Sequence, residues 1–429
     1  MPYDLLIRHA RLHRREGLVD LAIQDGRFAR IAPDLGAATA VREIDAAGSL
    51  LSPPFIDAHV HLDAVLTVGQ PRHNASGTLL EGIQIWSERK PGLSREDVRR
   101  RVMEEIRWEV AQGTLHIRSH VDVCDPKLTA LRALLEIREE VRDICDLQLV
   151  AFPQDGILSF PNGRELMRQA IELGCDVVGG IPHYEWTNAM GVEDVHYVFE
   201  LAREFHRDID CHCDETDDPH SRFTEVMAAD TLQQGWQGRV TASHCTAMHS
   251  YDNAYAFKLT RLLARAQVNV VANPFDNVIL QGRFDTYPKR RGITRVKELL
   301  ASGVNVALGH DSIMDPWFPL GRGDMLAAAQ LALFLCQMSG YEEIQDVLDL
   351  ITTNAARTLR IEGRYGIEEG KPASFLILDA PTAFEALRLL PARLYVFKDG
   401  REVARTTPAQ SRLTRLGEAE GSDVTYRVP

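Results

Sequence analysis

The sequence has no apolar run of about 18 residues, the length that a membrane-spanning helix needs. Its most apolar segment, residues 325–338, contains Gln330 and Gln337, which indicates a buried helix instead. The first residues also contain no apolar core of signal-peptide length. We therefore expect a cytoplasmic protein that has no membrane partner.

Paired cysteines and an excess of positive charge are also missing. The seven cysteines include no C-x-x-C pair, and scattered cysteines in a chain without an export signal are typical of reduced thiols. Lys and Arg number 48 against 61 Asp and Glu, which gives a formal net charge of −13. An acidic chain repels polyanions, so we expect a small-molecule partner and no nucleic acid.

The composition that is present, 45% hydrophobic and 25% charged, is that of an ordinary globular protein. Residues 1–52 alternate apolar and polar side chains, with Asp25-Gly26 as a hairpin signal. The same texture returns in residues 374–429, with Asp399-Gly400 as the turn. We expect these two terminal segments to form one small accessory β-sandwich.

Residues 53–373 instead alternate short apolar strands with helix-length, charge-rich segments, which is typical of repeated βα units. After the first strand, the strands recur at intervals of about thirty residues. Eight parallel strands at this spacing predict an α/β fold, a closed (β/α)₈ barrel of the TIM type. The predicted strands are Phe55–His61, Leu115–Val123, Leu147–Phe152, Asp176–Ile181, Asp208–Cys213, Arg239–His244, Val268–Ala272 and Val304–Gly309.

Histidines stand where these strands end, at the edge that carries the active site in such barrels. His59 and His61 are two residues apart on the first strand, so both side chains face the same side. Alone, this pair could equally be hydrogen-bonded core histidines. Strand five adds His212, strand six adds His244 and strand eight adds Asp311. Because four strands agree, we expect a metal site.

The imidazoles of the first and fifth strands and the Asp311 carboxylate suit one divalent ion, iron or zinc, with room for a water. Such an ion lowers the pKa of bound water from about 15.7 to about 7, which makes hydroxide available at neutral pH. Glu215, just past strand five, could then carry protons, although it could also be a solvated loop acid. His244 would hydrogen-bond the attacking oxygen, unless it is a core histidine.

Further polar residues end strands two to four. His120 and Asp122 close strand two and could line the pocket, but the ligand set is complete without them. Gln154 follows strand three, and His183 follows strand four, where it would stack near a substrate or brace a metal ligand. His310 points to the opposite side of its strand from its aspartate neighbour, so we expect it to pack in the core.

The order H-x-H, His, His, Asp resembles the amidohydrolase superfamily, and within it the bacterial-type cytosine deaminases. The segments that carry the resemblance include "PPFIDAHVHLD", "HCDETDD", "RVTASHCTAMHSY" and "GHDSIMDPWFPLG", and they run through nearly all of the predicted barrel. The resemblance implies a mononuclear iron or zinc site, a cytoplasmic enzyme and a homo-oligomer. Binuclear relatives carry a bridging lysine after strand four; its absence here agrees with one metal.

Residue by residue, the resemblance implies hydrolytic deamination of a cytosine-type base. Glu215 would be the proton shuttle that protonates N3 so that C4 accepts hydroxide, and His244 would stabilise that hydroxide. Gln154 would bind the O2/N1 edge of the ring, and Trp317 would pack on the pocket and exclude water. The implied metal ligands are His59, His61, His212 and Asp311, of which Asp311 would also act in catalysis.

One residue departs from the family pattern. Members usually carry a second aspartate after the metal-binding one, against the C5 edge of the base, whereas here Ser312 follows Asp311. Serine is smaller and uncharged, and room for a methyl group is worth about 1–3 kcal/mol of discrimination. We expect 5-methylcytosine, giving thymine, as the preferred substrate, with cytosine also turned over. The alternative is a neutral replacement that leaves cytosine preferred.

Two other activities stay open on the same fold. One changes the ring to isoguanine, a pterin or a triazine, although Gln154 and Ser312 favour a ring of pyrimidine size. The other is cyclic-amide hydrolysis, which prefers two metals. A metal-free scaffold would have lost ligands, and none is lost. The basic segment Gly282–Leu300 opens a predicted helix and suits a solvated face or a subunit contact, most plausibly through Phe284–Arg291.

Overall fold

The computed structural model describes residues 2–414, 422–424 and 426. Its chain forms two compact units, one of residues 54–365 and one of residues 1–53 together with 366–429. The predicted accessory segment 374–429 belongs to the second unit, and the part of it in residues 415–421, 425 and 427–429 lies outside the described residues.

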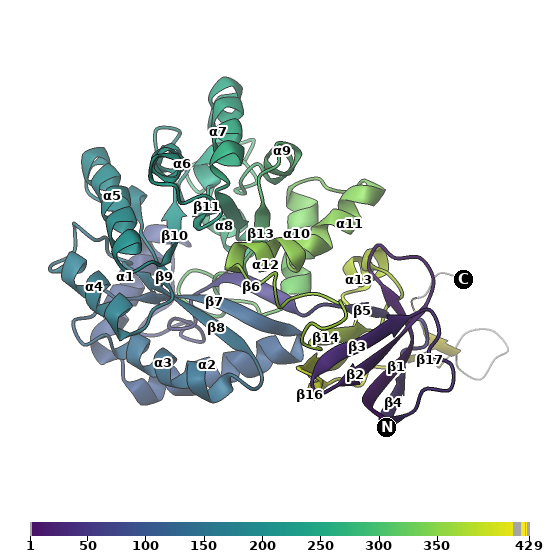
Figure 1. The fold of residues 1–429 in the computed structure, drawn as a ribbon. Helices are drawn as coiled ribbons and strands as arrows, with labels where there is room; N and C mark the ends of the chain where they lie inside the picture. Colours follow the sequence, from purple (N-terminus) through teal and green to yellow (C-terminus); the bar gives the residue numbers. More distant parts are fainter. Residues whose placement is uncertain (1, 415–421, 425, 427–429) are drawn as a thin grey trace. The chain divides into compact units, whose positions relative to one another are not determined.

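The larger unit contains an eight-stranded parallel sheet, which confirms the predicted barrel fold (Figure 1). Its strands are β6 (Phe55–Val60), β7 (Thr114–Asp122), β8 (Asp146–Phe152), β9 (Val177–Val178), β10 (Asp208–Cys213), β11 (Val240–His244), β12 (Asn269–Ala272) and β13 (Val306–Leu308). Each strand pairs with its neighbours in chain order, and a parallel bridge from Val60 to Asp311 joins the segment after β13 to β6. All the carboxyl ends of the strands therefore meet at one rim.

Strand β9 is shorter than the predicted Asp176–Ile181 because Gly179 and Gly180 follow it, and glycine weakens strand pairing. A Cβ on Gly179 would lie 2.5 Å from the carbonyl oxygen of Ala151 on β8. The close approach of the two backbones therefore requires glycine at this position.

Helices follow the strands and lie outside the sheet (Figure 1). Several begin at a side-chain cap: Ser94 Oγ accepts from the N–H of Asp97 at the start of α2, and Asp252 caps α7 in the same way. The helices of this unit are α1 (Leu79–Arg89), α2 (Arg95–Ala111), α3 (Thr129–Val141), α4 (Gly163–Leu173), α5 (Asn188–Glu204), α6 (Phe223–Gln234), α7 (Asn253–Ala266), α8 (Pro274–Leu280), α9 (Val296–Ala301), α10 (Met325–Leu335), α11 (Tyr341–Asp349) and α12 (Thr353–Leu359).

The barrel interior also holds a buried ion pair. Arg118 on β7 donates to Asp210 on β10 at 2.9 Å, and its remaining N–H groups reach the side chain of Gln148 at 2.9 Å and the carbonyl oxygen of Thr358 at 3.0 Å. Ser243 Oγ donates to the second oxygen of Asp210 at 2.6 Å. The charges of this cluster are thus matched within the chain.

The smaller unit is built from strands of both termini. Its elements are β1 (Tyr3–Leu12), β2 (Val19–Gln24), β3 (Arg27–Ala32), β4 (Ala40–Asp45), β5 (Leu50–Ser52), β14 (Phe375–Leu378), β15 (Arg393–Lys398), β16 (Arg401–Arg405), β17 (Ser411–Leu413), β18 (Ser422–Val424) and the helix α13 (Ala383–Leu389). Strand β1 pairs with β2 and β4 along most of its length and with β5 at its end, so it connects two layers. The rings of Phe28, Phe375 and Phe397 lie in the apolar core.

The two predicted hairpin turns of this unit are present. Asp25-Gly26 joins β2 to β3 and Asp399-Gly400 joins β15 to β16, and all four residues have positive φ, which type I′ turns require. A Cβ on Gly26 would lie 2.8 Å from the carbonyl oxygen of Asp399. The two turns therefore lie against each other, and a larger residue does not fit.

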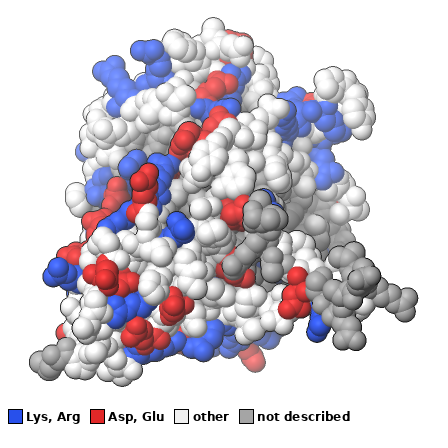
Figure 2. All heavy atoms as spheres, turned by 90° about the vertical axis from the view of Figure 1, so that its right-hand side faces the viewer, with Lys and Arg blue, Asp and Glu red and all other residues white. Residues whose placement is uncertain are grey.

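In the described part of the chain, every helix is too short or too polar to span a bilayer. All seven cysteines are free thiols. Figure 2 shows one face of the protein, where Lys and Arg side chains lie among Asp and Glu side chains.

Candidate active site

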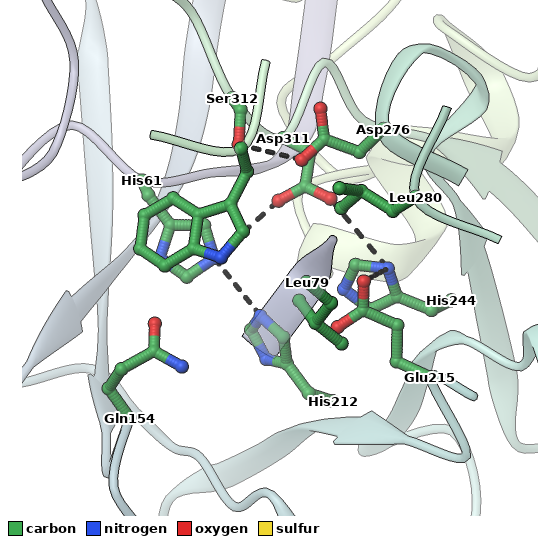
Figure 3. Close-up of a pocket in the computed structure, with 11 residues that line it drawn as sticks. His61, Leu79, Gln154, His212, Glu215, His244, Asp276, Leu280, Asp311 and Ser312 are labelled. Carbon is green, nitrogen blue, oxygen red and sulfur yellow. Dashed lines mark hydrogen bonds and ion pairs between the residues drawn. The ribbon is translucent and has the colours of Figure 1, made fainter. Parts of the chain in front are cut away.

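The carboxyl ends of the barrel strands surround a cavity of about 290 Å³ (Figure 3). It combines apolar walls with converging polar side chains, as ligand sites usually do. The residues that line it are His61, Leu79, Gln154, His212, Glu215, His244, Asp276, Leu280, Asp311, Ser312 and Trp317.

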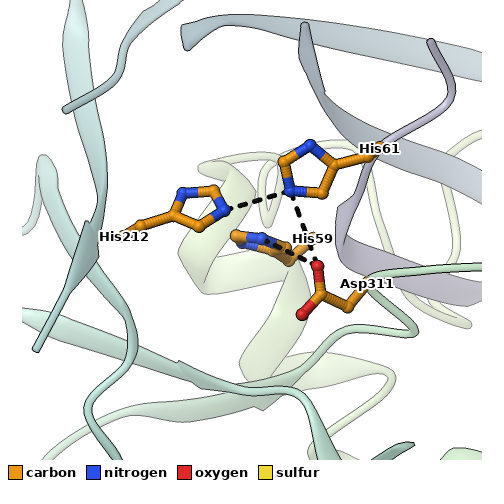
Figure 4. Close-up of side chains that lie close together, drawn as sticks. All are labelled: His59, His61, His212 and Asp311. Carbon is orange, nitrogen blue, oxygen red and sulfur yellow. Dashed lines mark hydrogen bonds and ion pairs between the residues drawn. The ribbon is translucent and has the colours of Figure 1, made fainter. Parts of the chain in front are cut away.

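A cluster of three histidines and one aspartate lies at this cavity (Figure 4). His61 Nε2 lies 3.0 Å from His212 Nε2, and Asp311 Oδ1 lies 3.5 Å from the Nε2 atoms of both His59 and His61. Two ligands at about 2.1 Å from a tetrahedral ion are themselves about 3.4 Å apart. The cluster therefore has the spacing that one shared divalent ion requires.

The ring nitrogens of His59 support the same conclusion. Both are buried and have no hydrogen-bond partner among the described residues, and the same is true of His212 Nδ1. Buried polar atoms are rarely left unpaired. Burial lowers the pKa of His61 to about 4 and lowers that of His59 and His212 as well, so the imidazoles are neutral and their lone pairs are available.

Backbone hydrogen bonds hold the two ends of the barrel sheet together at the cluster. The N–H of Asp311 donates to the His59 carbonyl at 2.8 Å, and the N–H of His61 donates to the Asp311 carbonyl at 2.9 Å. Asp57 Oδ1 accepts from the N–H groups of both His59 and His310. These bonds hold Asp311 at a φ of 71°, a value that a non-glycine residue adopts only when its surroundings impose it.

Glu215 lies deep in the cavity beside His244. Its Oε1 is 3.5 Å from His244 Nδ1, which in turn is 3.6 Å from Asp311 Oδ2. Burial raises the pKa of Glu215 to about 8, so this carboxyl can both hold and release a proton near neutral pH. The preceding residue, Asp214, accepts from the N–H groups of Phe223 and Thr224, which fixes the loop that carries Glu215.

Other walls of the cavity are formed by the Gln154 amide, the Trp317 indole and the Leu79 side chain. Gln154 extends its amide into the space from the segment after β8 (Figure 3). Trp317 packs against α1, where a Cβ on Gly82 would lie 2.4 Å from the indole, so glycine is needed for this approach. Leu79 of the same helix also lines the cavity.

Comparisons with known proteins identify the family of this chain. The sequence pattern of the Amidohydrolase family matches residues 42–404. The chain belongs to the amidohydrolase family. This confirms the family that the strand-end motifs predicted.

Three relatives resemble this amidohydrolase along nearly its whole length. The crystal structure of 5-methylcytosine deaminase from Klebsiella pneumoniae, liganded with 5-fluorocytosine, is 49% identical, covers 95% of this chain and 99% of its own, and superposes with a TM-score of 0.93. N-isopropylammelide isopropyl amidohydrolase of Pseudomonas sp. (strain ADP) is 30% identical over 94% of this chain and 98% of its own. Pterin deaminase of Rhizobium rhizogenes is 29% identical over 92% and 90%.

Two of the other predicted residues of the amidohydrolase take part in contacts near the cluster. The His120 ring packs against the His59 ring, with ring centroids 3.9 Å apart and the ring planes tilted by 33°. His120, His59 and Asp210 form a second group with metal-ligand spacing, but Asp210 is already occupied by an arginine and a serine hydroxyl. Asp122 accepts from the Trp86 indole N–H at 2.9 Å. Neither His120 nor Asp122 lines the cavity.

His183 and His310 also lie outside the set of residues that line the cavity. His310 packs against Phe275, with ring centroids 4.7 Å apart, and its Nδ1 lies 3.0 Å from the Ser312 carbonyl oxygen. This is the core packing expected from its strand position. The role of His183 beside a substrate or a ligand stays a prediction.

The segment after β12 supplies site residues that the sequence reasoning missed. Asn273 and Asn277 lie 3.3 and 3.1 Å from the ring nitrogens of His244, and Asp276 and Leu280 line the cavity. Their spacing of three or four residues places them on one face of α8. The available signal was that three of the five residues after the seventh predicted strand are polar (Asn273, Asp276 and Asn277), at the position where other strands carry their site residues.

Proposed function

We propose that this amidohydrolase deaminates cytosine-type free bases by hydrolysis, with 5-methylcytosine, giving thymine and ammonia, as the preferred substrate and cytosine, giving uracil, also turned over. The observation that carries the proposal is one small cavity that unites the histidine and aspartate cluster, the buried Glu215 and the Gln154 amide. The 49% identity to a 5-methylcytosine deaminase liganded with a cytosine analogue supports the substrate class.

The proposed ligands of one divalent ion, iron or zinc, are His59, His61, His212 and Asp311. When bound, such an ion supplies hydroxide at neutral pH because it lowers the pKa of a water. The three imidazoles and the carboxylate are all buried, and their ligand atoms lie close enough together to share one ion.

Gln154 would orient the base. Its amide oxygen can accept from N1–H of the ring and its NH₂ group can donate to O2, which together recognise the edge opposite the reacting carbon. Trp317 and Leu79 would cover the ring and exclude water from it. Both side chains belong to or contact the apolar cluster beside α1.

Glu215 would move the protons of the reaction. As the oxygen of the attacking water bonds to C4, Glu215 takes one of its protons and delivers it to N3. The second proton of that oxygen then passes to the C4 amino group, the C4–N bond breaks, and ammonia leaves. His244, held by Asn273 and Asn277, would hydrogen-bond the attacking oxygen.

Ammonia release from a panel of bases tests the proposal. We expect the metal-loaded protein to convert 5-methylcytosine and cytosine, with one ammonia released per thymine or uracil formed. Isoguanine, pterin, N-isopropylammelide and a dihydropyrimidine represent the alternative activities, and the 30% identical relative makes the triazine the strongest of these. Turnover of one of these compounds without turnover of either cytosine would show the proposal to be wrong.

We further propose that the protein acts in the cytoplasm as a homo-oligomer. Phe284 and Tyr287, in the segment predicted as a subunit contact, are 86% and 89% exposed, and aromatic side chains are enriched at protein–protein interfaces. Replacing both by serine should shift the protein to a smaller species in analytical ultracentrifugation. An unchanged sedimentation coefficient would contradict this contact.

A further inference from the structure

We propose that Asp276 determines the specificity of this site: by holding the hydroxyl group of Ser312, it keeps the wall beside C5 of the base free of a hydrogen-bond donor and thereby favours a 5-methyl group. This inference rests on the proposed function and adds a residue to it. It is carried by a contact between two cavity-lining side chains.

The two residues lie in the segments that follow two adjacent strands of the barrel. Asp276 lies in the first turn of α8, after β12, and Ser312 follows β13, which pairs with β12. Ser312 Oγ donates to Asp276 Oδ2 at 2.7 Å (Figure 3). Both residues are buried, with 2% of the surface of Asp276 and 1% of that of Ser312 exposed, and both line the cavity.

The position of Gln154 indicates which part of the base faces this pair. In Figure 3, Gln154 lies on the opposite side of the cavity from Asp276 and Ser312. In a pyrimidine, C4 and C5 lie across the ring from N1 and C2. A base whose O2/N1 edge is bound by Gln154 therefore directs its C4–C5 edge toward the pair.

The contact decides what the ring meets there. A serine hydroxyl has one hydrogen, and here that hydrogen is directed to Asp276, so Ser312 offers no donor to the base. Without Asp276, the hydroxyl would need another acceptor. Beside cytosine, a water could fill the space at C5 and accept a hydrogen bond from this hydroxyl. The methyl group of 5-methylcytosine would displace that water and leave the hydroxyl unpaired. Loss of Asp276 should therefore penalise 5-methylcytosine more than cytosine.

The test compares the ratio of kcat/KM for 5-methylcytosine to that for cytosine. Asp276→Leu keeps a similar volume and removes the acceptor, and we expect the ratio to fall about tenfold. In a Ser312→Ala background there is no hydroxyl to release, so the same change should alter the ratio by less than about twofold. Asp276→Asn retains a carbonyl acceptor and should keep the ratio within about threefold of the wild type. The affinity ratio of the products, thymine and uracil, should follow the same order.

The ratio separates this role from a general structural one. Equal loss of activity toward both bases in Asp276→Leu, or an equal change of the ratio with and without the Ser312 hydroxyl, would overturn the inference while leaving the proposed function intact. If Asp276→Leu does not fold, as judged by circular dichroism, Asp276→Val carries the same expectation. A wild-type protein that turns over neither base overturns both proposals.

Discussion

Two buried polar clusters occupy the same barrel, and they differ in where their partners come from. Around Arg118, the guanidinium is paired with Asp210 and hydrogen-bonded to Gln148 and a carbonyl oxygen, all from the chain itself. Around His59, buried ring nitrogens have no hydrogen-bond partner among the described residues. The cluster around Arg118 makes its hydrogen bonds within the chain and leaves no site for a ligand. The cluster around His59, the open cluster, keeps free ligand atoms that a metal ion can use.

The largest effect should follow from removing a ligand of the open cluster. Asp311→Ala should lower the metal content from about one ion per chain to near zero and reduce activity by several orders of magnitude. The free energy of unfolding of the metal-free protein should not fall, because burial raises the pKa of Asp311 and, among the described residues, only histidines lie within ion-pair distance of its carboxylate. Elemental analysis, ammonia release and urea denaturation measure the three quantities.

The matched control for this variant is His120→Asn. His120 packs against His59 but is not one of the proposed ligands, so the metal content of this variant should stay near that of the wild type. Metal loss in His120→Asn equal to that in Asp311→Ala would mean that the second group of His59, His120 and Asp210 holds the ion. In that case, the assignment of the ion to the cluster that contains Asp311 would be wrong.

The next effect concerns chemistry without metal loss. Glu215→Gln keeps the size of the side chain but cannot move protons, and we expect kcat to fall by about 10²–10⁴. Metal content and the affinity for thymine should change little, because Glu215 is not one of the proposed ligands. A variant that retains more than about a tenth of the wild-type kcat would show that another group moves the protons.

Changes in the Arg118 cluster should affect the free energy of unfolding of the protein. Arg118→Met leaves Asp210 buried without its cation, and breaking a buried pair costs about 3–5 kcal/mol in the free energy of unfolding. Replacing both partners, as Arg118→Met with Asp210→Leu, should recover most of that loss. The midpoint of urea unfolding measures both variants. An equal loss in the single and the double variant would contradict the account of Arg118 as a matched charge.

These clusters also show how far the sequence could be interpreted. The strand pattern predicted all eight barrel strands, and the strand-end rule led to His59, His61, His212 and Asp311, because side-chain direction along a strand follows from its period. Beyond a strand end that period is lost. Asp276 lies four residues past β12, on a helix whose direction depends on tertiary packing, and its contact with Ser312 joins two separate loops.

The smallest effect should come from Ser312→Asp, which places a second carboxylate on the wall beside Asp276. Aspartate is larger than serine, and the two carboxylates would lack the hydroxyl that pairs with Asp276 in the wild type. The kcat/KM for 5-methylcytosine should therefore fall relative to that for cytosine by about tenfold, within the 1–3 kcal/mol that one methyl group is worth. Metal content should be unchanged, since Ser312 is not one of the proposed ligands. If the wild type tolerates the methyl group no better than Ser312→Asp does, serine at this position does not set the preference. The open cluster would then define the reaction but not the base, and the base would be chosen elsewhere in the cavity.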